Sequence, residues 1–186
     1  MKRSQINKAI SNAELFFTNN NCYLPPNPKW DVTDFGLNEF ESKGLVLVNL
    51  ANELEYCEKL MFAKKNQITP EHFHKVKKED IICRIGELGV ILWNDLNQEN
   101  EQVPVKINGE PTFIKSGELI VLKPGERITI SPLQWHTFFP ISDECIISEV
   151  STANDDENDN FFIDKNIGRF PEIIEDEPAS YKLINE

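Results

Sequence analysis

Three histidines and one glutamate form the strongest chemical pattern in this sequence. His72 and His74 are separated by one residue, Glu79 follows after a short interval, and His136 is the last histidine of the 186-residue chain. Residues two apart on a β-strand point to the same face, so the first two imidazoles would project side by side. The polar interval at residues 75–78 can turn the chain and bring the carboxylate back toward them. The spacing therefore predicts a site for one metal ion.

An alternative interpretation is that the three histidines are unrelated polar residues, two of which fall two positions apart by chance on a surface strand. One site accounts for all three histidines, however, with a carboxylate at short spacing and apolar segments around them. We therefore favour the metal site. Mixed imidazole and carboxylate ligands suit Mn, Fe, Co, Ni or Zn and disfavour a cysteine-rich structural zinc site.

The segments that must position these residues are short and separated by turns. From Gly44 onward, apolar or alternating runs are interrupted by turn signals at Asn108-Gly109, Ser116-Gly117 and Pro124-Gly125. Many short strands with no helical pattern between them favour a closed or double-sheet antiparallel fold over a parallel α/β fold. The predicted strands are residues 44–50, 55–63, 70–74, 81–85, 89–93, 103–107, 111–114, 118–122, 127–130, 136–139 and 144–151.

The N-terminal residues follow a different pattern. Ser4 is predicted to cap an amphipathic helix over residues 5–18, and the prolines of residues 25–28 predict an extended arm. The apolar residues at helical spacing are Ile6, Ile10, Ala13 and Phe17. We expect a single domain over residues 1–186, with the helix and arm in 1–43, a β-barrel core in 44–151 and a C-terminal segment packed on the barrel in 152–186.

The composition is that of a soluble globular protein. No apolar run approaches the roughly 20 residues of a membrane span, and the N-terminus lacks the pattern of a signal peptide, which predicts a cytoplasmic protein without a membrane partner. A formal net charge of −12 repels phosphate backbones and disfavours nucleic-acid binding. The four cysteines are scattered without a CxxC motif, so we expect reduced and mostly buried thiols.

The histidine and glycine spacing resembles the two metal motifs of the cupins, whose fold is a double-stranded β-helix or jelly roll. The first motif spans residues 72–86 and reads HFHKVKKEDIICRIG, and the second runs through residues 117–136. Two details depart from the usual pattern. Asn66 stands where a glycine is usual, and the Pro-Gly turn after Gly117 is shifted by one residue. The resemblance implies an all-β jelly roll with the N-terminal helix and arm added to it.

A more specific resemblance, from about residue 3 to 186, is to the D-lyxose isomerase family of cupins. The segments that carry it are Tyr56-Cys57-Glu58-Lys59, Glu149-Val150-Ser151-Thr152, Asn154-Asp155-Asp156 and Gly168-Arg169-Phe170-Pro171-Glu172. The resemblance implies a metal-dependent aldose–ketose isomerase, or ketol-isomerase, acting on a free monosaccharide. Its reaction would be D-lyxose to D-xylulose and, as a second reaction, D-mannose to D-fructose. It also implies a homodimer and one divalent ion, with Mn²⁺ expected and Co²⁺, Fe²⁺, Ni²⁺ or Zn²⁺ as alternatives.

The same resemblance implies roles for residues outside the ligand set. Alternation places Glu149 on the face it shares with Cys145 and Ile147, and the family likeness makes it the candidate base that moves a proton between C2 and C1. A metal-assisted hydride shift is the alternative mechanism. Burial there is expected to raise the pKa of the Glu149 carboxyl. Lys59 resembles a family lysine that faces the substrate. Without the resemblance, an exposed strand-end glutamate and a surface lysine are the ordinary interpretations.

Predicted substrate contacts are Asp155 and Asp156, for distal hydroxyls, and Phe138 in the pocket wall. Their acidic segment, residues 154–160, lacks the glycine and glutamate that a calcium loop requires, so we expect a solvated or substrate-facing loop. Arg169 is expected to pair with a carboxylate and order the C-terminal segment. The aromatic residues expected in the core or pocket wall are Phe73, Trp135, Phe138 and Phe139.

Two other functions fit the same metal ligands. A cupin dioxygenase or oxidase holds Fe, Mn or Ni with a similar set, whereas an isomerase needs a separate acid/base such as Glu149 and consumes no oxygen. A non-catalytic sugar-binding cupin would have no reason to keep four ligands, and it would not depend on Glu149.

Overall fold

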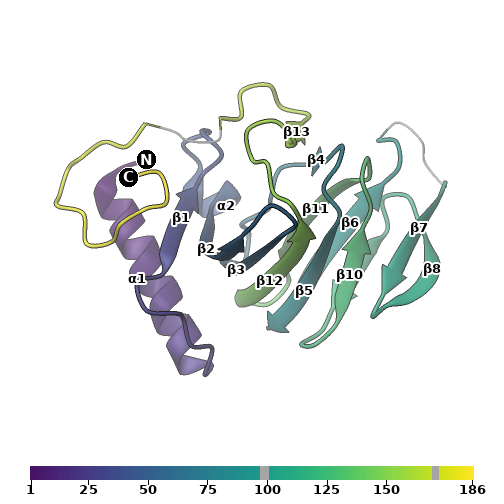
Figure 1. The fold of residues 1–186 in the computed structure, drawn as a ribbon, viewed down its shortest axis with the longest axis horizontal. Coiled ribbons are helices and arrows are strands. Elements are labelled where there is room, and N and C mark those ends of the chain that lie inside the picture. The colour runs from purple at the N-terminus through teal and green to yellow at the C-terminus, as the bar shows by residue number, and fades with distance from the viewer. Residues whose placement is uncertain (97–100, 169–171) are drawn as a thin grey trace.

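The computed structural model describes residues 1–96, 101–168 and 172–186. Its strands form two antiparallel sheets, and the long helix α1 (Arg3–Asn19) lies along one side of the larger sheet (Figure 1). A short helix, α2 (Phe40–Lys43), precedes the second strand. Arg169, with its predicted role in the C-terminal segment, lies outside the described residues.

The strand order gives each sheet its shape. The larger sheet is ordered β1 (Lys29–Thr33), β2 (Leu45–Asn52), β3 (Tyr56–Lys64), β12 (Glu144–Thr152), β5 (Glu79–Ile85), β10 (Arg127–Ile130), β7 (Gln102–Ile107) and β8 (Glu110–Lys115). The smaller sheet is ordered β13 (Phe161–Phe162), β4 (His72–Phe73), β11 (Trp135–Pro140), β6 (Leu88–Trp93) and β9 (Leu119–Leu122). Strands distant in sequence are therefore neighbours in both sheets.

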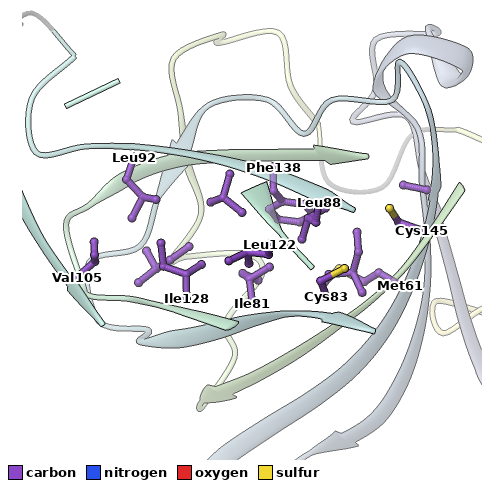
Figure 2. Close-up of a cluster of buried hydrophobic side chains, with 14 of the residues drawn as sticks. Met61, Ile81, Cys83, Leu88, Leu92, Val105, Leu122, Ile128, Phe138 and Cys145 are labelled. Carbon is purple, nitrogen blue, oxygen red and sulfur yellow. The ribbon is translucent and has the colours of Figure 1, made fainter. Parts of the chain in front are cut away.

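The main hydrophobic core fills the space between the two sheets (Figure 2). Ile81 and Cys83 of the larger sheet pack in one cluster with Leu88 of the smaller sheet. Because side chains alternate along a strand, one face of β12 carries Ile147 into this core and places the buried Glu149 next in the same row. The predicted two-sheet jelly roll is confirmed. Buried polar residues such as Glu149 continue the apolar core toward one end of the interior.

A second apolar cluster joins α1 to the opposite face of the larger sheet. Ile10 and Phe17 of the helix belong to one buried cluster with Val48 and Phe62 of the sheet. The helix is thus held by its apolar face, as the helical spacing predicts. None of the described helices is long and apolar enough to cross a membrane.

The N-terminus of α1 differs from the prediction. The helix begins at Arg3, so the prediction of Ser4 as its N-cap is wrong. Ser4 lies in the first turn, where its backbone N–H and its hydroxyl donate hydrogen bonds of 3.0 and 2.7 Å to Asp176. A carboxylate from the C-terminal segment satisfies an N–H group that the first turn leaves without a helical partner.

Turn residues adopt the backbone conformations that their chemistry permits. Asn108 and Gly109, between β7 and β8, have φ values of 53° and 85°, as a two-residue hairpin turn with positive φ requires. Asn66, which replaces the usual glycine of the cupin motif, has a φ of 77°. Asparagine tolerates this left-handed region better than most residues, so the turn before the metal motif is retained.

Two strand predictions are displaced around the metal motif. The predicted strand at 70–74 is reduced to His72–Phe73, and the predicted strand at 81–85 begins two residues earlier, at Glu79. The predicted turn therefore occupies residues 74–78, and Glu79 is held by strand pairing. β1 and β13 were not predicted from the sequence, because each carries too short a pattern to be recognised without its partner strand.

Three of the four aromatic residues predicted for the core or pocket wall lie elsewhere. His72 and His136 face the interior, and so Phe73 and Trp135, which adjoin them on β4 and β11, point to the outer face of the smaller sheet. Phe139 follows the buried Phe138 and also points outward. The prediction was wrong for these three residues because the alternation that directs a histidine inward directs its neighbours outward.

Candidate active site

Three strands bring the predicted metal ligands together at one end of the interior. His72 on β4 pairs directly with His136 on β11, while Glu79 opens β5 on the opposite sheet. His74 follows β4 and is buried. One donor atom from each of the four residues lies within 4.8 Å of the other three. The four predicted ligands are therefore close enough together to share one ion.

Backbone carbonyls orient the three imidazole rings. Nδ1 of His72 lies 2.8 Å from the carbonyl oxygen of Pro70. Nδ1 of His74 lies 2.6 Å from the carbonyl oxygen of Asp159, and Nδ1 of His136 lies 3.0 Å from the carbonyl oxygen of Gln134. A carbonyl can only accept, so Nδ1 is the protonated nitrogen in each ring and Nε2 carries the lone pair. This arrangement fixes the tautomer of metal-binding histidines in general.

Several of the candidate ligand atoms are buried and have no hydrogen-bond partner among the described residues. Among the described residues, Nε2 of His74, Nε2 of His136 and Oε1 of Glu79 are buried without a hydrogen bond, although the last two lie 2.9 Å apart. Leaving such atoms unsatisfied costs about 1–3 kcal/mol each. A divalent cation would satisfy all of them, so the donor set fits the predicted metal.

Electrostatics favour the protonation states that bind metals. Burial and the neighbouring imidazoles hold the pKa of His72 well below its usual range, and burial also lowers the pKa of His74. Burial alone would raise the pKa of the Glu79 carboxyl, but Lys77 and His136 outweigh it and hold that pKa well below its ordinary value. Neutral imidazoles and an ionised carboxylate are the ligating forms of these groups.

Lys77 is a site residue that the sequence analysis did not identify. Its Nζ donates a hydrogen bond of 2.9 Å to Glu149 and lies 2.7 Å from Oε2 of Glu79. The side chain is buried, and the two carboxylates raise the pKa of its ammonium despite that burial. It belongs to a polar run, Lys75 to Lys78, that the sequence indicates only as a turn. Lys77 lies in the turn before β5, where strand alternation does not apply, so the sequence offered no signal beyond its nearness to Glu79.

Glu149 and Lys59, the predicted catalytic residues, lie in the same buried group. Lys59 Nζ lies 3.8 Å from Oε1 of Glu149 and donates a hydrogen bond of 3.0 Å to Asn154. It also lies 3.7 Å from a carboxylate oxygen of Asp156. Burial raises the pKa of Glu149, as expected, but Lys59 and Lys77 outweigh burial, and the net pKa is lowered. The expectation of a raised pKa is therefore corrected.

These residues line a cavity of about 220 Å³ between the sheets. Its wall includes three of the four predicted metal ligands, the catalytic candidates and the predicted contacts Phe138 and Asp156. Asp155 is exposed and is not part of that wall; its carboxylate accepts hydrogen bonds from Asn158. The cavity holds both charged groups and apolar surface, which suits a small polyhydroxylated molecule.

Residues 153–162 close one side of this cavity. Phe161 and Phe162 form β13, which pairs with Phe73 and His72 of β4. The acidic residues of the preceding loop are thereby brought over the metal ligands, and Asp156, Glu157 and Asn160 line the cavity from it. Of the two loop types expected from the sequence, the substrate-facing loop matches this position.

Asp159 connects that loop to the metal motif. Its carboxylate accepts hydrogen bonds of 2.7 to 3.2 Å from the backbone N–H groups of Lys75, Val76 and Lys77, and its carbonyl oxygen accepts from the His74 ring. These contacts hold its own pKa below the usual value, although burial acts in the opposite direction. Asp159 was not singled out from the sequence, because an aspartate in an acidic run gives no sign of a partner more than 80 residues away.

Sequence comparison provides an independent line of information. The sequence model of the D-lyxose isomerase family matches residues 27–186. This chain belongs to the D-lyxose isomerase family. Its similarity to a D-lyxose/D-mannose isomerase of Escherichia coli O157:H7 is 36% identity over a 223-residue alignment that covers 100% of this chain and 98% of the relative. A D-lyxose/D-mannose isomerase of Serratia proteamaculans is 34% identical, with coverage of 100% and 97%.

Solved structures show the same fold. The L-ribose isomerase of Cellulomonas parahominis superposes with a TM-score of 0.71 and 17% identity, covering 94% of this chain and 98% of that one. The predicted cupin jelly roll of this D-lyxose isomerase family member is confirmed by that likeness and by its two antiparallel sheets. The predicted family is confirmed as well.

Proposed function

We propose that this chain is a metal-dependent aldose–ketose isomerase that converts D-lyxose to D-xylulose and, as a second reaction, D-mannose to D-fructose. The observation that carries the proposal is the position of Glu149: a carboxylate outside the ligand set, buried in the same cavity as three of the four predicted ligands. The names of the relatives, D-lyxose/D-mannose isomerases and D-lyxose ketol-isomerases, support the substrate class.

His72, His74, Glu79 and His136 would hold the divalent ion. The free Nε2 atoms and the carboxylate oxygen described above support this assignment. When bound, such an ion acts as a Lewis acid toward the sugar oxygens, an effect worth several kcal/mol. We propose Mn²⁺ as the ion, because a set of three imidazoles and one carboxylate suits it, with Co²⁺, Fe²⁺, Ni²⁺ and Zn²⁺ as alternatives.

Glu149 is the proposed base that takes the proton from C2 and returns it to C1. The lowered pKa keeps its carboxylate ionised at neutral pH, so that it is ready to accept a proton. Lys77 fixes the carboxylate through the 2.9 Å hydrogen bond, and Lys59 lies on its other side. A positioned base of this kind contributes typically 10²–10⁴-fold to the rate.

Lys59 and the acidic loop are proposed to bind the sugar. The Lys59 ammonium can donate to a sugar oxygen, and Asp156 and Phe138 both line the cavity. Asp156 is the proposed contact for a distal hydroxyl. Asp155, which holds Asn158, is proposed to shape the loop. We further propose that residues 1–186 fold as one domain and act in the cytoplasm as a homodimer.

One experiment tests the isomerase directly. Protein loaded with Mn²⁺ is incubated anaerobically with a panel of pentoses and hexoses, and ketose formation is followed. We expect D-xylulose from D-lyxose and slower formation of D-fructose from D-mannose. Absence of any ketose, together with substrate-dependent oxygen uptake in air, would contradict the isomerase and indicate the oxidase alternative. A sugar that binds without being converted or oxidised would indicate a non-catalytic binding protein.

A further inference from the structure

Strand pairing arranges the interior side chains of the larger sheet in rows that cross β5, β12, β3 and β2. Glu149 pairs with Lys59 of β3, and its partner on β5 lies two positions after Glu79. Met61 lies two positions beyond Lys59 on the side away from the ligand, and it pairs with Leu47 of β2. A path from the proposed metal ligand through the proposed base therefore arrives next at two apolar side chains.

Met61 and Leu47 form an apolar part of the cavity wall. Both line the cavity, although they are only 1% and 8% exposed. Phe138 of the smaller sheet lines the same cavity and belongs to the same core cluster (Figure 2). Asp31 pairs with Leu47 on β1 but is not part of the wall. The cavity thus changes from charged to apolar within one step along the strands.

The hydroxyl groups near this apolar part are used by the protein or lie farther away. Thr69 lines the cavity, but its hydroxyl donates to the carbonyl oxygen of Phe138 at 3.1 Å and accepts from the N–H of the same residue at 2.9 Å. Thr33 lies one row farther along β1, where its hydroxyl accepts a hydrogen bond of 2.8 Å from a backbone N–H group. Among the described residues of the wall, the row of Met61 and Leu47 therefore offers a ligand apolar contact.

The spacing of the rows places the end of a six-carbon chain at Met61. Two residues along a β-strand span about 6.6 Å. The acyclic chain of an aldohexose spans about 5 Å from C2 to C6, because it has four carbon–carbon bonds of about 1.5 Å at tetrahedral angles. With C1 and C2 at the proposed metal and Glu149, C6 reaches the row of Met61 and Leu47. A pentose chain is one bond shorter, so its terminal hydroxyl stays nearer Lys59 and Asp156.

This geometry separates three sugars that share the configuration at C2, C3 and C4. D-lyxose ends at C5 and does not enter the apolar row. D-mannose places a hydroxymethyl group beside Met61 and Leu47, where its hydroxyl loses water without gaining a side-chain partner. 6-Deoxy-D-mannose places a methyl group at the same point, and a methyl group gains from apolar contact.

We propose that the site also isomerises 6-deoxyaldohexoses of the manno configuration and that it prefers 6-deoxy-D-mannose to D-mannose. This inference rests on the proposed isomerase function and names a further substrate class for the same site. The hydrogen at C2 moves to C1, and the hydroxyl proton at O2 is replaced by one at O1. The product is 6-deoxy-D-fructose, so the reaction requires no oxidant or reductant.

A comparison of sugars with the wild-type protein tests the preference. Protein loaded with Mn²⁺ is given D-lyxose, D-mannose or 6-deoxy-D-mannose, and ketose formation is measured over a range of sugar concentrations. Because a hydrophobic pocket disfavours an added hydroxyl by up to about 100-fold, we expect kcat/KM to be roughly 10- to 100-fold higher for 6-deoxy-D-mannose than for D-mannose.

The outcomes distinguish the inference from the proposed function. Conversion of D-lyxose, with 6-deoxy-D-mannose converted no better than D-mannose, would overturn the preference and leave the isomerase intact. Failure to convert any of the three sugars would contradict the proposed isomerase and the inference with it.

A matched pair of substitutions at Met61 tests the apolar row. Met61→Gln keeps the length of the side chain and adds an amide that can donate to a C6 hydroxyl or accept from it. Met61→Leu keeps the row apolar and is the control. We expect the kcat/KM ratio of 6-deoxy-D-mannose to D-mannose to fall toward parity in Met61→Gln and to stay at the wild-type value in Met61→Leu.

The ratio is the informative quantity because a general loss of active protein affects both sugars equally. An unchanged ratio in a Met61→Gln protein that still converts D-lyxose would contradict a contact between Met61 and C6. Circular dichroism verifies folding of both variants. Should Met61→Gln fail to fold, the comparison of the two six-carbon sugars in the wild type decides.

Discussion

Lys77 donates a 2.9 Å hydrogen bond to Glu149 from within the protein interior. Because the same ammonium lies 2.7 Å from Glu79, a single buried cation joins a proposed metal ligand to the proposed base. The position of the base relative to the ligands is therefore set by a fixed side chain, independently of the substrate.

Replacement of Lys77 by methionine should destabilise the metal-free protein. The substitution leaves Glu79 and Glu149 buried without their shared cation, and breaking a buried ion pair in this way costs about 3–5 kcal/mol. Denaturant unfolding in the presence of a chelator measures the loss. Lys78→Met is the matched control, because Lys78 is exposed and should change the free energy of unfolding by less than about 0.5 kcal/mol. Equal effects of the two substitutions would contradict the role of Lys77.

Glu149→Gln should greatly reduce turnover while leaving metal content unchanged. The amide cannot take up the C2 proton, so we expect kcat/KM to fall by about 10²–10⁴-fold. The control is Glu157→Gln, a substitution in the same cavity wall at an exposed residue. Ketose formation and metal analysis are carried out on the same samples. Wild-type turnover by Glu149→Gln with metal bound would exclude Glu149 as the base.

Asp159→Asn should weaken metal binding. In the wild type, the Asp159 carboxylate accepts hydrogen bonds from the backbone N–H groups of Lys75 and Lys77. The side-chain NH₂ of an asparagine would face these donors and could not accept from them. The substitution would therefore disturb the loop whose Asp159 carbonyl oxygen contacts the His74 ring. Loss of a residue that orients a ligand typically lowers metal affinity by about 10–100-fold. Titration calorimetry with Mn²⁺ measures the effect, and Glu157→Gln, at an exposed residue of the same loop, is the control. Unchanged affinity in Asp159→Asn would show that the contact does not position His74.

The contribution of Arg3 to stability should depend on pH. Its guanidinium donates to Glu175 and Glu186, and these hydrogen bonds lower the pKa of both carboxyl groups. A lowered folded-state pKa gives stability that is present above the unfolded value of about 4.3 and is lost as pH falls through the folded value. The destabilisation caused by Arg3→Met should therefore be constant from pH 7 to about pH 5 and shrink below about pH 4.

Thermal unfolding at a series of pH values measures this dependence. Lys8→Met is the control, since Lys8 lies on the exposed side of the same helix. A difference between Arg3→Met and the wild type that grows on acidification would contradict the assignment.

Much of the fold was predictable because it depends on local patterns. Alternation identified the core strands, and Asn108-Gly109 marked its hairpin, since both signals act over a few residues. β13 could not be recognised in this way, because two residues form a strand only when β4 is present to pair with them. The prediction of Ser4 as the helix cap was wrong for a similar reason. The carboxylate that accepts a hydrogen bond from the first turn belongs to Asp176, which is distant in the sequence.

The sequence by itself determined which four side chains are the candidate ligands, the face of the strand on which Glu149 lies, and the family. The residue types and the alternation of side chains between the two faces of a strand are properties of the local chain. They do not depend on how the sheets are arranged. Only the tertiary structure decided that Lys77 binds Glu149 and that Asp159 orients His74, over separations of 72 and 85 residues. A charged side chain in a polar run is ordinarily solvated. It becomes part of a site only when folding removes its water and supplies a partner, and that is decided by how distant strands pair.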